Sequence, residues 1–128
     1  MRARPAIIAI DDETANGDAR VTVTLDWADK EWHGSAIGGA DERFRLAGEA
    51  TLHAVEQLTG GTIDLELLAV ATTEVQGIRV ALAQVRFGQS DVLVGSALEG
   101  PAEAGLAAVR AVMDAVNRRL ERTLYSDR

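Results

Sequence analysis

The sequence predicts an α+β fold in which one βββα unit occurs twice in tandem, with antiparallel sheets covered by two helices. Two observations support this prediction. A Gly-Ser-Ala segment at residues 34–39 recurs 61 residues later at 95–100. Strand-like segments lead up to each copy, and a helix-like segment follows each one. We therefore expect residues 1–128 to form a single domain built of two repeats, about 5–60 and 61–124.

The similarity between the two copies continues into the segments that follow them. At the same spacing of 61 residues, identical residues occur at Glu42/Glu103, Ala47/Ala108, Ala50/Ala111, Ala54/Ala115 and Val55/Val116. Alanine has the highest helix propensity, and small side chains also allow close helix packing. The pattern therefore indicates an internal duplication that extends through both helices.

The first repeat is predicted to contain three strands and one helix. Apolar, β-branched or alternating residues mark the strands, and Asn16-Gly17 is a hairpin signal between the first two. Asp11 and Asp12 are expected to end the first strand. The predicted segments are strands at 6–10, 21–27 and 31–37 and a helix at 41–58. The apolar stripe of the helix is Phe44, Ala47, Thr51, Ala54, Val55 and Leu58.

The second repeat follows the same order. Gln76-Gly77 is the corresponding turn, and Pro101 is suited to a helix start because its missing N–H has no partner there. The predicted segments are strands at 63–73, 78–87 and 92–98 and a helix at 101–124. The stripe of this helix is Leu106, Val109, Met113, Val116 and Leu120. Its last turns carry Arg118, Arg119 and Arg122, where the helix dipole favours cations.

The composition excludes several classes of function. A hydrophobic fraction of 47% and a charged fraction of 26% are typical of a globular protein. The formal net charge of -7 argues against nucleic acid as a partner, since phosphates require a positive surface. The absence of cysteine excludes disulfides and thiol nucleophiles and suits a cytoplasmic protein. The N-terminal apolar run is too short for a signal peptide or membrane span.

The tandem βββα order resembles a known regulatory domain. A Gly-rich break precedes each helix, and the last helix ends in Ala-Val-Asn-Arg-Arg-Leu at residues 115–120. These features are similar to the C-terminal regulatory (dimerisation) domain of the 2-isopropylmalate synthase family. Asn117 and Leu120 stand roughly where that family has an Ala-x-Asn-x-Leu-like pattern. The resemblance implies a dimerising module that senses a small ligand and is not itself a synthase.

Four residues are the candidates for ligand binding. Trp32 is an aromatic side chain suited to a dimer surface or a small cavity, and His33 lies beside it. Gly39 and Gly100 precede helices, where free N–H groups could hold a carboxylate or phosphate. The alternative is that these glycines only make the turn from strand to helix, since acidic residues already occupy both helix starts.

Metal and catalytic sites are weakly indicated. Glu49 and His53 are four residues apart on one helix face, yet two ligands do not make a site. The acidic residues 11–13 could hold Mg²⁺ or Ca²⁺ but more often solvate a loop. Ser35 and Ser96 recur without a nucleophile-elbow pattern. No catalytic residue, metal or cofactor is therefore predicted.

We expect a non-catalytic, self-associating module, most simply a homodimer, that regulates or senses a small ligand or serves as a small subunit of a larger assembly. One alternative is a protein-interaction scaffold without a small ligand. A second alternative is a small metal-dependent enzyme that uses Glu49 and His53 or the acidic residues 11–13. No nucleic acid or membrane partner is expected.

Overall fold

A computed structural model describes residues 4–100 and 104–125, and it confirms the predicted βββα–βββα order. Each unit contains one three-stranded antiparallel sheet, sheet A (β1-β2-β3) and sheet B (β4-β5-β6). The elements of the first unit are β1 Ala6–Ala15, β2 Asp18–Trp27, β3 Lys30–Gly39 and α1 Arg43–Leu58. Those of the second are β4 Leu65–Val75, β5 Ile78–Phe87, β6 Asp91–Leu98 and α2 Ala104–Tyr125.

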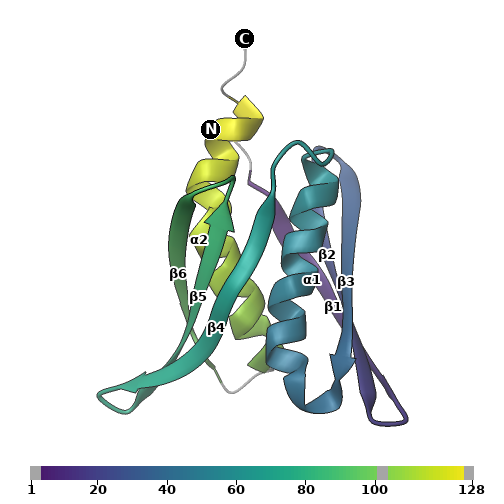
Figure 1. Ribbon diagram of the computed structural model, residues 1–128, viewed down its shortest axis with the longest axis vertical. Helices are drawn as coiled ribbons and strands as arrows, with labels where there is room; N and C mark the ends of the chain where they lie inside the picture. The colour runs from purple at the N-terminus through teal and green to yellow at the C-terminus, as the bar shows by residue number, and fades with distance from the viewer. Residues whose placement is uncertain (1–3, 101–103, 126–128) are drawn as a thin grey trace.

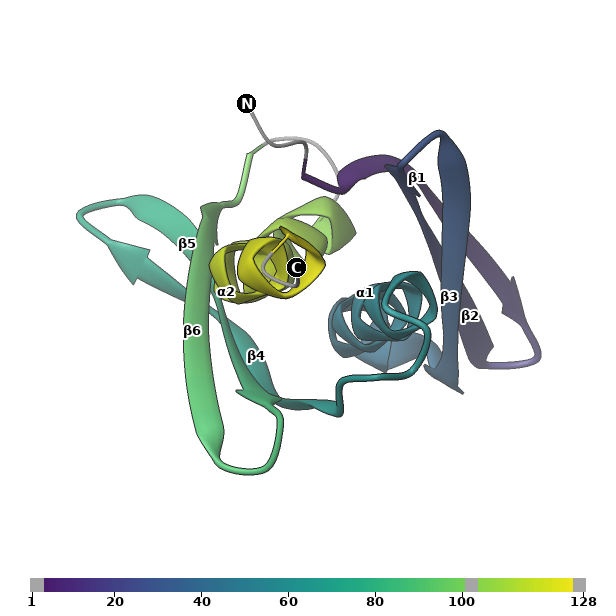
Figure 2. The same cartoon turned by 90° about the horizontal axis from the view of Figure 1, so that it is seen from above.

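The four parts stack as layers in the order sheet A, α1, α2, sheet B (Figures 1 and 2). Each helix covers one face of the sheet of its own unit, and the two helices pack against each other in the middle. The apolar stripes predicted for both helices supply most of this core, in which Val55, Val109, Val116 and Leu120 are fully buried. The other face of each sheet is left open to solvent.

A glycine in the third strand of each unit sets how closely the helix packs. A Cβ atom at Gly34 would lie 2.2 Å from both the carbonyl oxygen of Ala50 and the amide nitrogen of Ala54. Gly95 has the same relation to Ala111 and Ala115, at 2.2 and 2.3 Å. The repeated Gly and Ala positions of the sequence are therefore the points where strand and helix backbones touch. No larger residue fits there.

The duplication extends to the irregular features of the sheets. A register shift occurs between Ile7 and Ala9 in β1 and between Leu67 and Ala69 in β4, 60 residues apart. After β5 the spacing becomes 61, because residues 88–90 connect β5 to β6 whereas only 28–29 connect β2 to β3. One extra residue in a hairpin turn thus accounts for the change in spacing, and the units correspond strand by strand.

The three strands of the first unit are longer than the sequence patterns predicted, whereas β5 has the predicted bounds. β1 does not end at Asp11 but continues to Ala15, and its acidic residues pair with β2. β4 has the predicted length but lies two residues later, at Leu65–Val75 instead of 63–73. The β1–β2 and β4–β5 hairpins project beyond the helices at one end of the molecule (Figure 1). Polar residues are tolerated in these projecting hairpins because the helices cover little of them, so their side chains remain exposed to solvent.

The helix starts differ slightly from those predicted. A short 3₁₀ turn, Ala40–Glu42, comes before α1, which then begins at Arg43. The predicted helix start at Pro101 lies outside the described residues, which resume with α2 at Ala104. Among the helices in the described part of the chain, neither has the length and apolarity required to cross a lipid bilayer.

The two arm hairpins provide a stability test. Asn16-Gly17 and Gln76-Gly77 both have positive φ, with Asn16 at 54° and Gln76 at 51°. Asparagine tolerates this conformation better than glutamine. We expect Gln76→Asn to raise the free energy of unfolding by about 0.5 kcal/mol and Asn16→Gln to lower it similarly. Urea titrations followed by circular dichroism would measure both, and equal stabilities would contradict the explanation.

Candidate functional site

The four residues predicted to bind a ligand do not form one site. Trp32 is half-buried near the start of β3 and donates a hydrogen bond from Nε1 to the carbonyl oxygen of Trp27 at 3.2 Å. His33 is exposed on the open face of sheet A, with Nδ1 2.9 Å from the Thr24 hydroxyl. Gly39 ends the same strand, about 23 Å along it at the usual rise per residue. Gly100 is in the other unit, beyond β6.

The N–H group of Gly39 already has an acidic partner. It donates to the Glu42 carboxylate at 3.1 Å, so the chain itself provides the anion at this helix start. A Cβ atom at Gly38 would lie 2.9 Å from a methyl carbon of Leu46. These two contacts account for the Gly-Gly pair as a turn and a close approach of strand to helix.

Glu49 and His53 each contact a different group. Glu49 forms an ion pair with Arg45 at 3.1 Å, while His53 donates from Nδ1 to the carbonyl oxygen of Ser35 at 2.6 Å. In the second unit the corresponding residue, Asp114, accepts a hydrogen bond from the amide of Ser96 at 2.9 Å. The two positions therefore have a common role, which is to tie the helix to the third strand.

The acidic residues 11–13 do not converge either. They lie within β1, where successive side chains point to opposite faces, so Asp12 is separated from Asp11 and Glu13. Asp12 pairs with Arg43 at 3.3 Å. Within residues 4–100 and 104–125, no group of three acidic, histidine or cysteine side chains is arranged to hold a metal ion.

The open face of sheet B is mainly apolar. In β5 the residues Ala81, Ala83, Val85 and Phe87 are buried against the helices, so the alternate residues point outward. The residues of β4 and β6 that pair with these outward residues of β5 lie on the same face, and most of them are apolar. The outward residues are Val80, Leu82, Gln84 and Arg86 of β5, Val92, Val94, Ser96 and Leu98 of β6, and Ala69, Ala71 and Thr73 of β4. Leu82, Val94 and Leu98 are 39%, 64% and 67% exposed.

The open face of sheet A is polar at the corresponding positions. Thr22 stands where the second unit has Leu82, and its hydroxyl lies 2.8 Å from that of Ser35. His33 stands in place of Val94 and Asp11 in place of Ala71. Two large apolar residues of sheet A are exposed: Ile37, which is 62% exposed and corresponds to Leu98, and Ile8, which is 49% exposed and lies at the irregularity of β1. The two units therefore have the same backbone but present faces of different chemistry.

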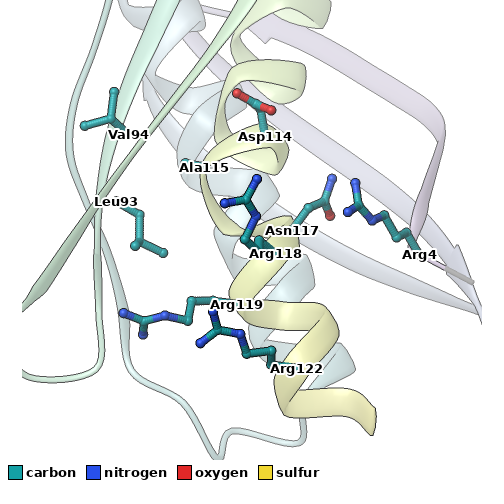
Figure 3. A pocket seen from close by; sticks show the side chains of 9 residues that line it. All are labelled: Arg4, Leu93, Val94, Asp114, Ala115, Asn117, Arg118, Arg119 and Arg122. Atoms are coloured by element: carbon teal, nitrogen blue, oxygen red, sulfur yellow. The ribbon is translucent and has the colours of Figure 1, made fainter. Parts of the chain in front are cut away.

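A cavity of about 340 Å³ lies between α2 and the edge strand β6 (Figure 3). Its wall includes Leu93 and Val94 from β6 and Ala115 from α2. Its charged and polar lining consists of Arg4, Asp114, Asn117, Arg118, Arg119 and Arg122. Four of the 13 basic residues of an acidic chain therefore line one cavity.

Two of these four arginines have acidic partners. Arg119 donates to Asp91 at 2.7 Å and lies 5.3 Å from the centre of the Phe87 ring, and Arg4 pairs with Glu121 at 3.2 Å. Among the described residues, neither Arg118 nor Arg122 has a hydrogen-bond or ion-pair partner. The side-chain oxygen of Asn117 is buried and also lacks a partner in that part of the chain.

Another arginine, Arg79, lies at the end of sheet B near the β4–β5 turn. Its hydrogen bond to Glu99, and then the charge of Glu99, raise the pKa of the Arg79 guanidinium above its ordinary value. Since arginine is already charged at every pH at which a protein of this kind folds, this pair gives no pH dependence. The pair lies on the side of sheet B that faces the helices, because Arg79 alternates with the outward Val80 and also bonds to Thr72, the neighbour of buried Ala81. The ion pair between Arg86 and Glu66 lies on the open face.

The sequence contains a signal for the apolar face of sheet B and another for the cavity lined by arginines. Residues 78–87 and 92–94 are apolar on both strand faces, which is unlike the clean alternation at 21–27. Arg118 and Arg122 are four residues apart and therefore share a helix face.

The chain shows no match to any protein-family model, and comparison with curated proteins also finds no match.

Proposed function

We propose that this protein is a non-catalytic module that self-associates through the open face of sheet B and senses a small ligand. The observation that carries the proposal is the contrast between the two sheets, since only sheet B has an extended apolar face. Burial of Leu82, Val94 and Leu98 against a second copy would remove them from water. The βββα–βββα order, which resembles that of the 2-isopropylmalate synthase regulatory domain, supports a regulatory module.

The charges around this face favour a second copy as the occupant. A two-fold pair places the same surface of both molecules in contact, so the surface must complement itself. Glu66 and Arg86 form an ion pair at one end of the open face, and the other outward residues of its three strands are uncharged. Because the charged end holds one residue of each sign, two copies meet without opposing blocks of like charge, although each chain has a net charge of -7.

The size of the face indicates a dimer that dissociates on dilution. Three strands about 4.8 Å apart and about eight residues long give a face of roughly 14 by 26 Å. This is about half of what one partner buries in an interface of standard size. We therefore expect the dimer fraction to rise with protein concentration over the micromolar to millimolar range.

Substituting the face tests the proposal. We expect the double variant Leu82→Lys/Leu98→Lys to be monomeric at concentrations at which the natural protein is dimeric, because four lysines would then meet in the interface. The matched control is Thr22→Lys/Ile37→Lys, which places lysines at the corresponding positions of sheet A. Light scattering after size-exclusion chromatography measures the mass. A natural protein that is monomeric throughout, or a control that dissociates equally, contradicts the proposal.

The main alternative is a scaffold whose apolar face binds a different protein. In that case the natural protein stays monomeric and the Leu82→Lys/Leu98→Lys variant keeps its mass. The apolar residues of the run 92–94 would then contact a protein other than a second copy of this chain. The concentration series therefore separates the two functions before any partner is sought.

A further inference from the structure

The arrangement of arginines around the α2–β6 cavity indicates a ligand of opposite charge. Arg118 and Arg122 are one helical turn apart and lie on the same side of α2 (Figure 3). Like charges at this spacing destabilise a helix. Asp91 and Glu121 pair with Arg119 and Arg4, and Asp114 accepts a hydrogen bond from Ser96. Among the described residues, no carboxylate lies within 4 Å of the charged groups of Arg118 or Arg122. An anion held between them would offset their repulsion.

The rest of the cavity indicates the form of that anion. Leu93 and Ala115 give the wall an apolar portion next to the guanidinium groups, whereas the side chain of Val94 points to the open face of sheet B. The volume of about 340 Å³ falls at the lower end of the range for small-molecule sites. A small molecule with a charged head and a short hydrocarbon part fits both properties of the lining.

The acidic residue of the cavity orients the ligand. Asp114 accepts a hydrogen bond from Ser96 and lies at one end of the group, while Arg119 and Arg122 lie at the other (Figure 3). Its negative charge repels an anionic head at its own end. The head is therefore directed away from Asp114 toward Arg122, with Arg118 between the two, and the apolar part lies toward Leu93 and Ala115.

From this geometry we infer that the cavity binds a small oxyanion, a carboxylate or phosphate with a short apolar substituent, through Arg118 and Arg122. Both arginines can donate two parallel hydrogen bonds to such a head. The inference rests on the ligand-sensing part of the proposed function and names the class of ligand. The site is separate from Trp32, His33, Gly39 and Gly100.

Isothermal titration calorimetry with butyrate, butyl phosphate and inorganic phosphate tests the inference, at ionic strength held constant with chloride. We expect butyrate or butyl phosphate to bind more tightly than inorganic phosphate, since only the former reach the apolar wall. We expect each of Arg118→Gln and Arg122→Gln to weaken binding by about tenfold, the value of one charge-assisted hydrogen bond. Arg110→Gln, an exposed arginine of the same helix, serves as the control.

The outcomes separate this inference from self-association. Equal affinities for the natural protein and both cavity variants, or an equal loss in Arg110→Gln, would mean that anions act only through general charge and would overturn the inference. Absence of heat with all three probes at millimolar concentration would overturn it as well. Masses from light scattering on the same samples report the dimer separately, so either proposal can fail while the other stands.

Discussion

Gly34→Ala and Gly95→Ala are expected to remove most of the stability of this protein. In each case the new methyl group would lie 2.2 Å from a backbone carbonyl oxygen of the helix above it. If the neighbouring atoms belonged to a side chain, that side chain could rotate away. The atoms of Ala50 and Ala111 that contact these glycines belong instead to the backbone of a regular helix. The whole helix must then shift, at an expected cost of about 3 kcal/mol or more. The total free energy of unfolding of a typical protein is only about 5–15 kcal/mol.

Urea unfolding followed by far-ultraviolet circular dichroism measures this loss. Gly100→Ala is the control, because a Cβ atom there would have no neighbour within 4 Å. We expect the control to be within about 0.5 kcal/mol of the natural protein, as for most surface changes. If Gly34→Ala unfolds at the same urea concentration as Gly100→Ala, the helix does not pack on β3 as described.

Val112→Asp is expected to unfold both units together. Val112 is fully buried in α2 and lies near Gly48 of α1, where the two helices meet. An unpaired carboxylate placed there loses its hydration without gaining a partner, at an expected cost of about 4 kcal/mol. Because both helices contribute to this contact, damage to one unit removes part of the core of the other.

The positions of the tryptophans make this effect measurable. Trp27 and Trp32, the only two in the chain, are both in the first unit, whereas the substitution is in the second. We expect tryptophan fluorescence and circular dichroism to report a single transition at a lower urea concentration. Arg110→Ala, an exposed position of α2, is the control. Native fluorescence in a Val112→Asp protein whose α2 has unfolded would show two independent domains instead of one.

The fold could be predicted because the duplication repeats the residues that determine it. Gly34 and Gly95 recur with the alanines that they contact, and the apolar stripes recur on both helices. The length of β1 was predicted wrongly for a physical reason. Asp11 and Glu13 point to solvent from a projecting hairpin, so the apolar pattern ends before the strand does.

The candidate sites were harder to predict because they combine distant parts of the chain. Arg4 and Arg118 line the same cavity although more than a hundred residues separate them. The spacing of Arg118 and Arg122 shows only that they share a helix face; the proximity of Leu93 and Val94 follows from the packing of α2 on sheet B. In sheet B, where both faces of the strands carry apolar residues, sequence patterns also could not show which face the helices leave uncovered.

The position of the helices between the sheets has a consequence for assembly size. Each molecule has two bare sheet faces that point in opposite directions (Figure 2). If both were adhesive, every added copy would present a fresh surface, and the molecules would stack into columns of unlimited length. Thr22, His33 and Asp11 make the face of sheet A hydrophilic. In the proposed dimer, growth would therefore stop at a pair, with the hydrophilic faces as its two outer ends.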